Sequence, residues 1–389
     1  MSQHYFATCP RGLEALLAEE IGAAGARAQP PVDGGVAFTG SPRHAWRLNL
    51  ESRFASRVYW QVAQGRYRSE QDIYRVASEV PWERWFDVEH TIRVGVDAQR
   101  SPLKSLEFVT LRIKDAVCDR FRIRRGARPS VDTSRPDMRI QAFLQAEQFV
   151  LYLDTSGDTL FKRGWRRDTG TAPLRENLAA GILALAGWKP GMPLFDGFCG
   201  SGTFLIEAAH WTLDRAPGLG RRFAFERFRT FEAPVWQAEL ERAQGRVRSQ
   251  PGLPLWGRDN DAGVLATAQR TLVELGLDQS VRLDCSDVLD AVAPAESGLW
   301  VSNPPYGVRQ ADLDELSLFY PRLGETMKRR FAGWRVGLLS SDMRLPKGVG
   351  LKPARRIPLF NGPLECRLFL FDMVAGSLRR VKAGEAPAG

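Results

Sequence analysis

The residues best suited to chemistry lie in the stretch NPPY, Asn303 to Tyr306, which follows the apolar run GLWVS. Proline lacks a backbone N–H and fixes its φ angle, so the carbonyl oxygen of Pro304 can be held free to accept a hydrogen bond. The side-chain oxygen of Asn303 is a second acceptor. Together they can hold both hydrogens of a planar NH₂ group and turn its nitrogen towards a methyl donor. Tyr306 could stack on the ring that carries this nitrogen.

This stretch therefore predicts methyl transfer to an amino group, with Asn303, Pro304 and Tyr306 as the catalytic residues. The alternative interpretation is a simple proline turn after a strand.

A glycine turn in MPLFDGFCGSGTFLIEAA predicts the site of the methyl donor. It joins an apolar strand ending at Asp196 to a new helix, whose first N–H groups are free. Gly200 and Gly202 let the backbone pass close beneath a ligand. The turn lacks the Gly-Lys-Ser/Thr of a phosphate loop and the full G-x-G-x-x-G pattern, so it does not favour a nucleotide phosphate. Cys199 lies inside this turn, and a packing role is expected for it.

Two acids end the next two apolar segments. Asp259 follows LPLWGR, where a carboxylate can bind a ribose hydroxyl pair, and Asp287 follows VRLDCS, where one could meet an adenine amino group. Capping or surface roles are the alternative for either acid alone, and Asp261 is expected to cap the following helix. A glycine turn, two acids and no phosphate-binding machinery predict S-adenosylmethionine as the cofactor.

The elements that must position these residues form an α/β pattern. From Trp165 onward, apolar segments alternate with helical ones, which indicates a mainly parallel, doubly wound sheet. Before it, strands and amphipathic helices mix in an α+β pattern. We therefore expect an amino-terminal region at 1–165, a catalytic domain at 166–382 and a frayed tail at 383–389.

Composition limits the function classes. The 389 residues carry a net charge of +9, which favours a polyanionic partner without identifying one. No run of 18 apolar residues occurs, and the amino terminus lacks the layout of a signal peptide. The five cysteines lie far apart and there are only four histidines, so neither disulfides nor a bound metal is expected. We expect a cytoplasmic protein without membrane contact, and its oligomeric state stays open.

An arginine cluster in the amino-terminal region is the candidate RNA contact. It contains no acid and could bind backbone phosphates, although such a run is usually a solvated helix face. With Arg163 near the domain boundary, the predicted RNA-binding residues are Arg120, Arg122, Arg124, Arg125, Arg128 and Arg163.

Beyond these motifs, nearly the whole chain resembles the RlmL-type 23S rRNA guanine-N2-methyltransferases, a group of class I S-adenosylmethionine-dependent enzymes. The segments that carry the resemblance are YFATCPRGLEALLAEE, KDAVCDRFRIRRGARPSVD, FKRGWRRDTGTAPLRENLAAGIL, DGFCGSGTFLIEAA, DRAPGLGRRFAFERF, GRDND, NPPYG and NGPLECRLFLFD. The chain departs from the family in having Asp196-Gly197 where Asp-Pro is common. It also ends soon after the guanine-N2 domain, so no second methylation is expected.

The resemblance implies a Rossmann-like, doubly wound methyltransferase domain preceded by an α+β region containing a THUMP RNA-binding domain. It places the cofactor at Asp196, Gly200, Gly202, Thr203, Asp259, Asp287 and Asn303, and the guanine at Asn303, Pro304 and Tyr306. The expected substrate is a guanine N2 in 23S rRNA, free or in a large-subunit assembly intermediate. Alternatives are a THUMP-type tRNA guanine-N2-methyltransferase, an adenine-N6 enzyme on DNA, and a non-catalytic RNA-binding ribosome assembly factor.

Overall fold

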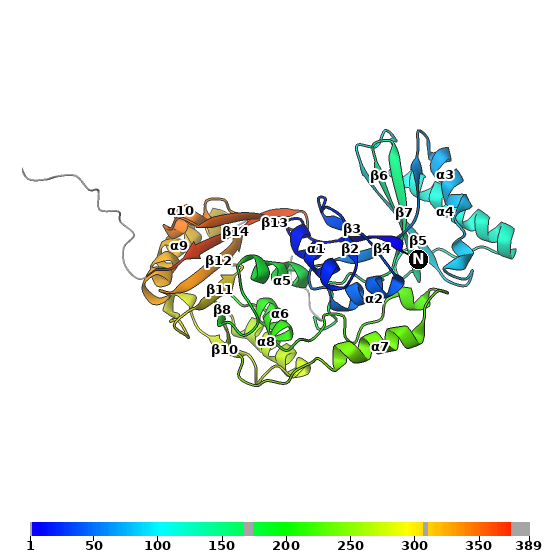
Figure 1. Ribbon diagram of the computed structural model, residues 1–389. Coiled ribbons are helices and arrows are strands. Elements are labelled where there is room, and N and C mark those ends of the chain that lie inside the picture. The colour runs from blue at the N-terminus through cyan, green and yellow to red at the C-terminus, as the bar shows by residue number, and fades with distance from the viewer. Residues whose placement is uncertain (1, 167–173, 306–309, 375–389) are drawn as a thin grey trace, which may run out of the picture. The chain divides into compact units, whose positions relative to one another are not determined.

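The computed structural model describes residues 2–166, 174–305 and 310–374 (Figure 1). Its chain divides into two compact units. The first unit comprises Met1–Gly181, His210–Gln250 and Leu359–Pro363, and the second comprises Ile182–Ala209, Pro251–Pro358 and Leu364–Gly389. The predicted domain boundary after residue 165 stays a prediction, and the tail predicted at 383–389 lies outside the described residues.

The first unit is built on a seven-stranded sheet with the order β2-β3-β1-β4-β7-β6-β5. Its strands are β1 Gln3–Thr8, β2 Arg27–Ala28, β3 Gly35–Gly40, β4 Arg57–Arg66, β5 Ile92–Gln99, β6 Met138–Gln145 and β7 Gln148–Asp154. All neighbours are antiparallel except β5 and β6, which are parallel. The mixture of helices and mainly antiparallel strands confirms the α+β character predicted from the sequence.

Helices cover one face of this sheet. They are α1 Glu14–Ala23, α2 Pro42–Glu51, α3 Glu70–Glu79 and α4 Leu106–Arg125. A further helix, α7 Ala233–Gln244, packs on α2, and short 3-10 turns lie at Trp82–Arg84 and Ala224–Arg227. Strand β6 shows why one face is covered: Met138, Ile140, Ala142 and Leu144 are buried, and the residues between them are not. Such period-two alternation places apolar side chains on one face of a strand and leaves the other face to solvent.

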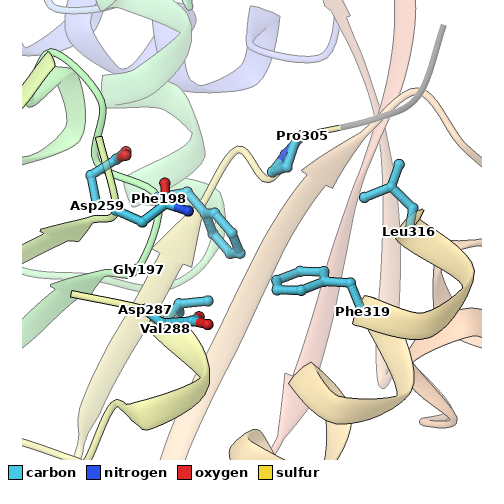
Figure 2. Close-up of a pocket in the computed structure, with 9 residues that line it drawn as sticks. Gly197, Phe198, Asp259, Asp287, Val288, Pro305, Leu316 and Phe319 are labelled. Atoms are coloured by element: carbon cyan, nitrogen blue, oxygen red, sulfur yellow. The ribbon is translucent and has the colours of Figure 1, made fainter. Parts of the chain in front are cut away.

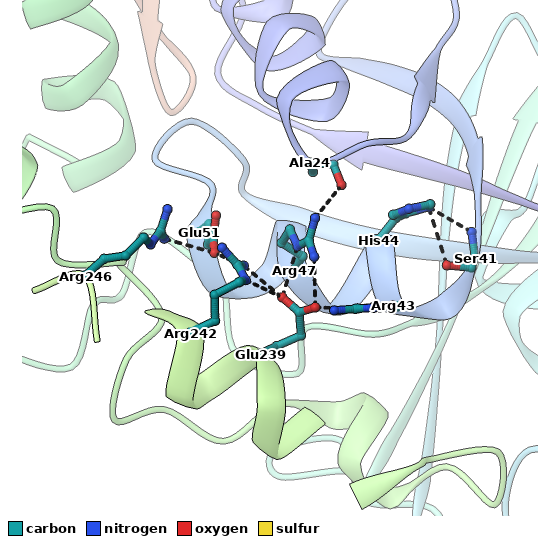
Figure 3. A network of polar contacts seen from close by, with 9 residues as sticks. All are labelled: Ala24, Ser41, Arg43, His44, Arg47, Glu51, Glu239, Arg242 and Arg246. Atoms are coloured by element: carbon teal, nitrogen blue, oxygen red, sulfur yellow. Dashed lines mark hydrogen bonds and ion pairs between the residues drawn. The ribbon is translucent and has the colours of Figure 1, made fainter. Parts of the chain in front are cut away.

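An ion-pair network joins α7 to α2 within the first unit (Figure 3). The carboxylate of Glu239 is fully buried and pairs with Arg43, Arg47 and Arg242. Burial alone would raise the pKa of Glu239, but hydrogen bonds from these three guanidinium groups outweigh it and lower the pKa to about 2. The segment around α7 is therefore held to the first unit by charge as well as by apolar packing.

Apart from the last three residues of β13, another seven-stranded sheet belongs to the second unit, with the order β10-β9-β8-β11-β12-β14-β13. Its strands are β8 Leu194–Asp196, β9 Leu255–Asp259, β10 Arg282–Cys285, β11 Gly298–Ser302, β12 Trp334–Ser340, β13 Arg355–Asn361 and β14 Leu364–Asp372. The five strands β8 to β12 run parallel, and β14 is antiparallel to β12. The doubly wound sheet predicted from the sequence is confirmed.

Helices α5 Glu176–Leu185, α6 Thr203–Thr212, α8 Ala262–Leu275, α9 Gln310–Arg330 and α10 Leu345–Val349 accompany these strands, with a 3-10 turn, η3, at Val288–Asp290. The side chain of Asp261 accepts hydrogen bonds from Gly263 N and Val264 N, which confirms the predicted cap of α8. Strand order reverses between β8 and β11. The carboxyl ends of these two strands therefore form a topological switch point, where doubly wound sheets bind ligands.

An aromatic core supports this switch point from below. Phe195 of β8, Trp300 of β11 and Phe331 pack with ring centroids 4.5 to 5.3 Å apart, and all three are buried. Because rigid rings anchor β8 and β11, the loops that follow these strands start from fixed positions. Within the part of the chain that the structure describes, no helix has the length and apolar character to cross a membrane.

Replacing Glu239 with Gln should destabilise the chain by about 3 kcal/mol at pH 7, because three arginines lose their buried counter-charge. The folded-state pKa is lowered from 4.5 to about 2, so this stabilisation is complete above about pH 4.5 and is lost as the pH falls towards 2. Thermal unfolding of both proteins from pH 3 to 8 measures it. Glu241→Gln, an exposed change on the same helix, is the control, and an equal loss in both variants would contradict the account.

Candidate functional site

The loop between β8 and α6 is shaped by its glycines. Gly200 and Gly202 have φ angles of 51° and 78°, in the left-handed region that favours glycine. At Gly197, a Cβ atom would lie 2.6 Å from Cγ2 of Val288 and 2.9 Å from the Trp300 ring, so no side chain fits there. The backbone is thus held close to η3 and β11 as it turns into α6.

The hydroxyl of Ser302 connects this loop to the end of β11. It donates a hydrogen bond to Asp196 Oδ1 at 2.8 Å, and it accepts one from Gly197 N at 2.9 Å and one from Trp300 Nε1 at 3.0 Å. One donor and two acceptor positions are all that a serine hydroxyl offers, so its capacity is fully used. Ser302 therefore fixes the ends of β8 and β11 relative to each other, one residue before Asn303.

Asp196 is buried beneath the loop and is not among the described residues that line the cavity discussed below. Burial raises its pKa to about 7, against the opposing effect of hydrogen bonds from Ser302 and from Phe198 N, and the charge of Asp259 raises it further. Asp196 thus supports the loop through its hydrogen bonds, and its contact with the cofactor stays a prediction.

Asp259 has two functions at the end of β9. Its Oδ2 accepts a hydrogen bond from Gly200 N at 2.9 Å, and its Oδ1 accepts one from Asp261 N at 3.1 Å. The same side chain lines the cavity described below. At the end of β10, Asp287 Oδ1 accepts a hydrogen bond from Leu289 N at 2.9 Å and starts η3. Both acids therefore stand at strand ends in fixed orientations.

A cavity of about 330 Å³ opens beside these carboxylates, and we call it the strand-end cavity (Figure 2). Its volume lies at the lower end of the range for small-molecule sites. Opposite the two acids, the rings of Phe198 and Phe319 meet edge to face, with centroids 5.9 Å apart. The described residues that line it are Gly197, Phe198, Asp259, Asn260, Asp287, Val288, Pro305, Leu316 and Phe319.

The charge of this lining restricts the ligand. Asp259 and Asp287 are its charged members, and no lysine or arginine is among the lining residues that the structure describes. Two carboxylates without a basic partner oppose a phosphate-bearing ligand and favour a cationic one with hydroxyl or amino donors. The apolar rings opposite them suit a flat aromatic group.

The NPPY stretch begins at the end of β11, as predicted. Asn303 is half-buried and Pro304 is buried. The carbonyl oxygen of Pro305 accepts a hydrogen bond from the Tyr320 hydroxyl at 2.8 Å, which attaches the stretch to α9. Neither the Asn303 amide nor the Pro304 carbonyl has a hydrogen-bond partner within residues 2–166, 174–305 and 310–374. Tyr306 lies outside the described residues.

Of the predicted cofactor residues, Asp259 and Asp287 line the strand-end cavity, whereas Gly200, Gly202 and Thr203 form the turn and first residue of α6 behind its wall. Sequence reasoning missed Phe198 and Phe319 and the tie at Ser302. For Phe198 the available signal was an aromatic residue inside the glycine turn, and for Ser302 it was a serine at the end of an apolar strand. For Phe319, which lies on α9, no signal connected it to the loop.

The predicted RNA-binding arginines fall into three environments. Arg124, Arg125 and Arg128 are exposed, and Arg122 is exposed beside Asp119. Arg120 is mostly buried in an ion pair with Glu83 at 2.7 Å.

Arg163 differs from the others. It is only 7% exposed, and its guanidinium donates to the carbonyl oxygens of Leu160 and Arg53 at 2.8 and 2.7 Å. The described contacts of this guanidinium are thus with backbone oxygens, and an RNA contact at Arg163 stays a prediction. Cys199 is also buried, and burial raises the pKa of its thiol, in keeping with the packing role expected for it. No group of three metal-ligating side chains occurs in the described ranges.

Three protein-family models match the chain. They are described as the RMKL-like methyltransferase domain, over residues 163–369, the THUMP domain, over 67–154, and the RlmL ferredoxin-like domain, over 4–59. The first model alone covers more than half of the sequence and includes the whole strand-end cavity.

Curated relatives match over almost all of this chain. A ribosomal RNA large subunit methyltransferase K/L from Syntrophotalea carbinolica is 39% identical over 98% of this chain and 55% of its own length. A putative RNA methyltransferase from Synechocystis sp. is 36% identical over 95% of this chain and 96% of its own length. The chain thus spans about half the length of the K/L relatives that it matches.

Solved structures also match both units. A putative methyltransferase in complex with SAH is 28% identical, covers 97% of this chain and 99% of its own, and has a TM-score of 0.87. A predicted N6-adenine-specific DNA methylase from Listeria monocytogenes is 29% identical, covers 96% and 97% of the two chains, and also has a TM-score of 0.87.

Asp196→Asn should change how stability depends on pH. The pKa of Asp196 rises from 3.8 to about 7 on folding, so the folded state holds a proton that the unfolded state loses. The proton on Asp196 therefore contributes at most about 4 kcal/mol to the free energy of unfolding. This contribution is complete below about pH 4 and is lost as the pH rises through 7. Chemical denaturation from pH 4 to 8 should show wild type losing stability relative to Asp196→Asn. A constant difference between the two would contradict the burial argument.

Proposed function

The chain belongs to the RMKL-like methyltransferase family, and from this premise we propose that it transfers a methyl group from S-adenosylmethionine to the exocyclic N2 of a guanine in 23S rRNA. The observation that carries the proposal is the strand-end cavity, where two carboxylates and two aromatic rings share the lining with Pro305 of the NPPY stretch at a topological switch point.

The residues of the cavity fit S-adenosylmethionine. Its lining carries two negative charges and has no basic side chain among the described residues, which suits a ligand with a sulfonium cation and no phosphate. When bound, the cofactor supplies an electrophilic methyl group. Asp259 would accept hydrogen bonds from the ribose hydroxyls, and Asp287 would accept one from the adenine amino group. Phe198 and Val288 give the cavity apolar surfaces for the adenine ring.

The target amine would be held by acceptors on the chain. The Asn303 side-chain oxygen and the Pro304 carbonyl are free of partners within the described residues and can take the two hydrogens of an exocyclic NH₂. Because an amine whose hydrogens are fixed presents its nitrogen in one direction, these contacts position it for methyl transfer. The guanine must leave its stack to reach this point, and Tyr306 is proposed to stack on it there. The amine can lose its proton to water after transfer.

An RNA substrate is supported by the relatives and by surface charge. The S. carbinolica relative is named for ribosomal RNA of the large subunit, and the chain matches a THUMP domain model. The exposed arginines of α4 and of the turn after it are the proposed phosphate contacts. The proposed substrate is 23S rRNA in the cytoplasm, either free or in a large-subunit assembly intermediate.

The proposal is tested by transfer of labelled methyl from S-adenosylmethionine to protein-free 23S rRNA, 16S rRNA and tRNA in parallel, followed by nucleoside analysis. N2-methylguanosine from 23S rRNA alone is expected. Label in tRNA would keep the chemistry and change the substrate. Cofactor binding without transfer to any RNA, a partly assembled large subunit included, would favour a non-catalytic assembly factor.

Asn303→Ala should reduce kcat by at least about 100-fold, because the residue holds the reacting amine in the transition state, while the Kd for S-adenosylmethionine stays within a few-fold. Asp287→Asn is the matched variant. It should raise that Kd and leave kcat at saturating cofactor much less affected. Single-turnover methyl transfer and calorimetric titration measure the two effects. Loss of cofactor binding in Asn303→Ala would remove this residue from its proposed role.

Neutralising Arg122, Arg124 and Arg125 together with glutamine should weaken RNA binding and flatten its dependence on salt. Three lost phosphate contacts correspond to a change of about 2 in the slope of log K against log salt for single strands. Arg322, Lys328 and Arg329 of α9, changed to glutamine, give the same change in net charge in the second unit and serve as the control. Equal slopes in the two triple variants would show that α4 does not contact RNA.

A further inference from the structure

The face of the first sheet that the helices leave uncovered carries an aromatic cluster. Residues directly opposite in paired strands project from the same face. Phe6 of β1 lies opposite Tyr59 of β4, and Gln61 of β4 lies opposite Tyr152 of β7. The ring centroid of Tyr152 is 6.2 Å from that of Phe6 and 5.7 Å from that of Tyr59. These three rings therefore form one continuous apolar surface across three neighbouring strands.

The exposure of these rings shows that the cluster is not part of the core. Phe6, Tyr59 and Tyr152 are each partly accessible, whereas their neighbours along the strands, such as Tyr5 and Leu151, are buried. Helices α3 and α4 lie on the other side of strands β5 to β7 (Figure 1). A partly exposed aromatic cluster on the open face of a sheet is where some RNA-binding modules stack two or three bases.

Arginines gather beside the rings on the same face. Arg93 of β5 lies directly opposite Arg139 of β6, and both line a hollow of about 190 Å³ together with Arg57 and Tyr59. Asp154 is the acid among the described lining residues, and Arg57 already pairs with it.

Arg139 has no hydrogen-bond or ion-pair partner in the described part of the chain. Its partial burial, and then the charge of Arg57, lower its pKa. Arg93 uses one donor on the carbonyl oxygen of Thr133 at 3.1 Å. Like charges directly opposite each other destabilise a sheet, so an anion bound between Arg93 and Arg139 would relieve a repulsion that the folded chain otherwise carries.

The hollow selects among anions by its size and surroundings. At about 190 Å³ it is smaller than the sites that enclose whole cofactors. It adjoins the aromatic cluster, because Tyr59 belongs to both. A ligand with a phosphate for the hollow and flat rings for the adjacent cluster matches both features. A single-stranded nucleic acid has this combination, whereas the bases of a duplex are stacked on each other.

We propose that this face binds a single-stranded segment of the RNA substrate, with a backbone phosphate between Arg93 and Arg139 and neighbouring bases on Tyr59, Tyr152 and Phe6. The inference rests on the proposed function, because it takes RNA as the substrate. It adds a contact surface on the opposite side of the sheet from α4, so one short strand cannot use both surfaces at once.

The test is a titration of the whole chain with a fluorescein-labelled oligouridylate of about 12 nucleotides, within the usual site size for single-strand binders. Anisotropy is measured at several KCl concentrations. Arg93→Gln with Arg139→Gln should weaken binding by at least about 10-fold at low salt and reduce the salt slope by about 0.7, the value for one lost phosphate contact on a single strand. Arg68→Gln with Arg75→Gln changes net charge equally and should leave both quantities close to wild type.

A second pair of variants tests stacking apart from charge. Tyr152→Leu should weaken binding by at least about 5-fold without changing the salt slope, because a base loses its aromatic partner and no cation is removed. Tyr152→Phe keeps the ring and should bind like wild type. Thermal unfolding of each variant shows whether the sheet is intact, and a loss in Tyr152→Leu that Tyr152→Phe does not share cannot come from the missing hydroxyl.

Equal affinity and salt slope in the Arg93/Arg139 variant and in its control would overturn the inference, as would failure of the wild-type chain to bind the oligonucleotide at low salt. A duplex of the same length bound as tightly as the single strand, with the same sensitivity to Tyr152→Leu, would also overturn it. The labelled-methyl assay is read separately. If the wild-type chain methylates RNA and the Arg93/Arg139 variant binds the oligonucleotide like its control, the proposed function stands and only the inference about this face is wrong.

Discussion

The three hydrogen bonds of the Ser302 hydroxyl fix the ends of β8 and β11 relative to each other, and the strand-end cavity of the second unit is built around these two strand ends. Every polypeptide segment around the strand-end cavity starts from β8 or β11 or packs against them. The glycine turn leaves β8 next to Asp196, and the NPPY stretch leaves β11 next to Ser302 itself. If this tie were absent, a buried carboxyl, a backbone N–H and an indole N–H would each lose a partner in a place that water does not reach.

Rigidity at this point explains why residues that do not contact a ligand still determine the site. Asp196 supports the loop from below, and Asp259 orders it from the side through Gly200 N. Burial beneath the loop raises the pKa of Asp196 to about 7. Fixed dipoles and carboxylates need no rearrangement when a reaction occurs, and this is the main way in which proteins lower barriers to group transfer.

Much of this arrangement could be predicted from the sequence because its signals are local. The glycine turn, the acids at strand ends and the helix cap at Asp261 each depend on a few adjacent residues. The alternation of strands and helices predicted that all of them lie at the carboxyl edge of one parallel sheet. What could not be predicted depends on distant partners. Phe319 meets Phe198 across 121 positions of sequence, and Arg163 looked like a surface cation until the carbonyl oxygens around it were known. The opposition of Arg93 and Arg139 likewise requires the strand register.

The path of the chain between the two units has a consequence for biosynthesis. The first unit contains Met1–Gly181, then His210–Gln250 and finally Leu359–Pro363, with parts of the second unit between them. The Glu239 network that attaches α7 to α2 therefore cannot form until roughly two thirds of the polypeptide has been made, although α2 emerges from the ribosome early. During translation, Arg43 and Arg47 therefore lack their Glu239 partner until α7 has been made. For the same reason, a single proteolytic cut would not release either unit in one piece.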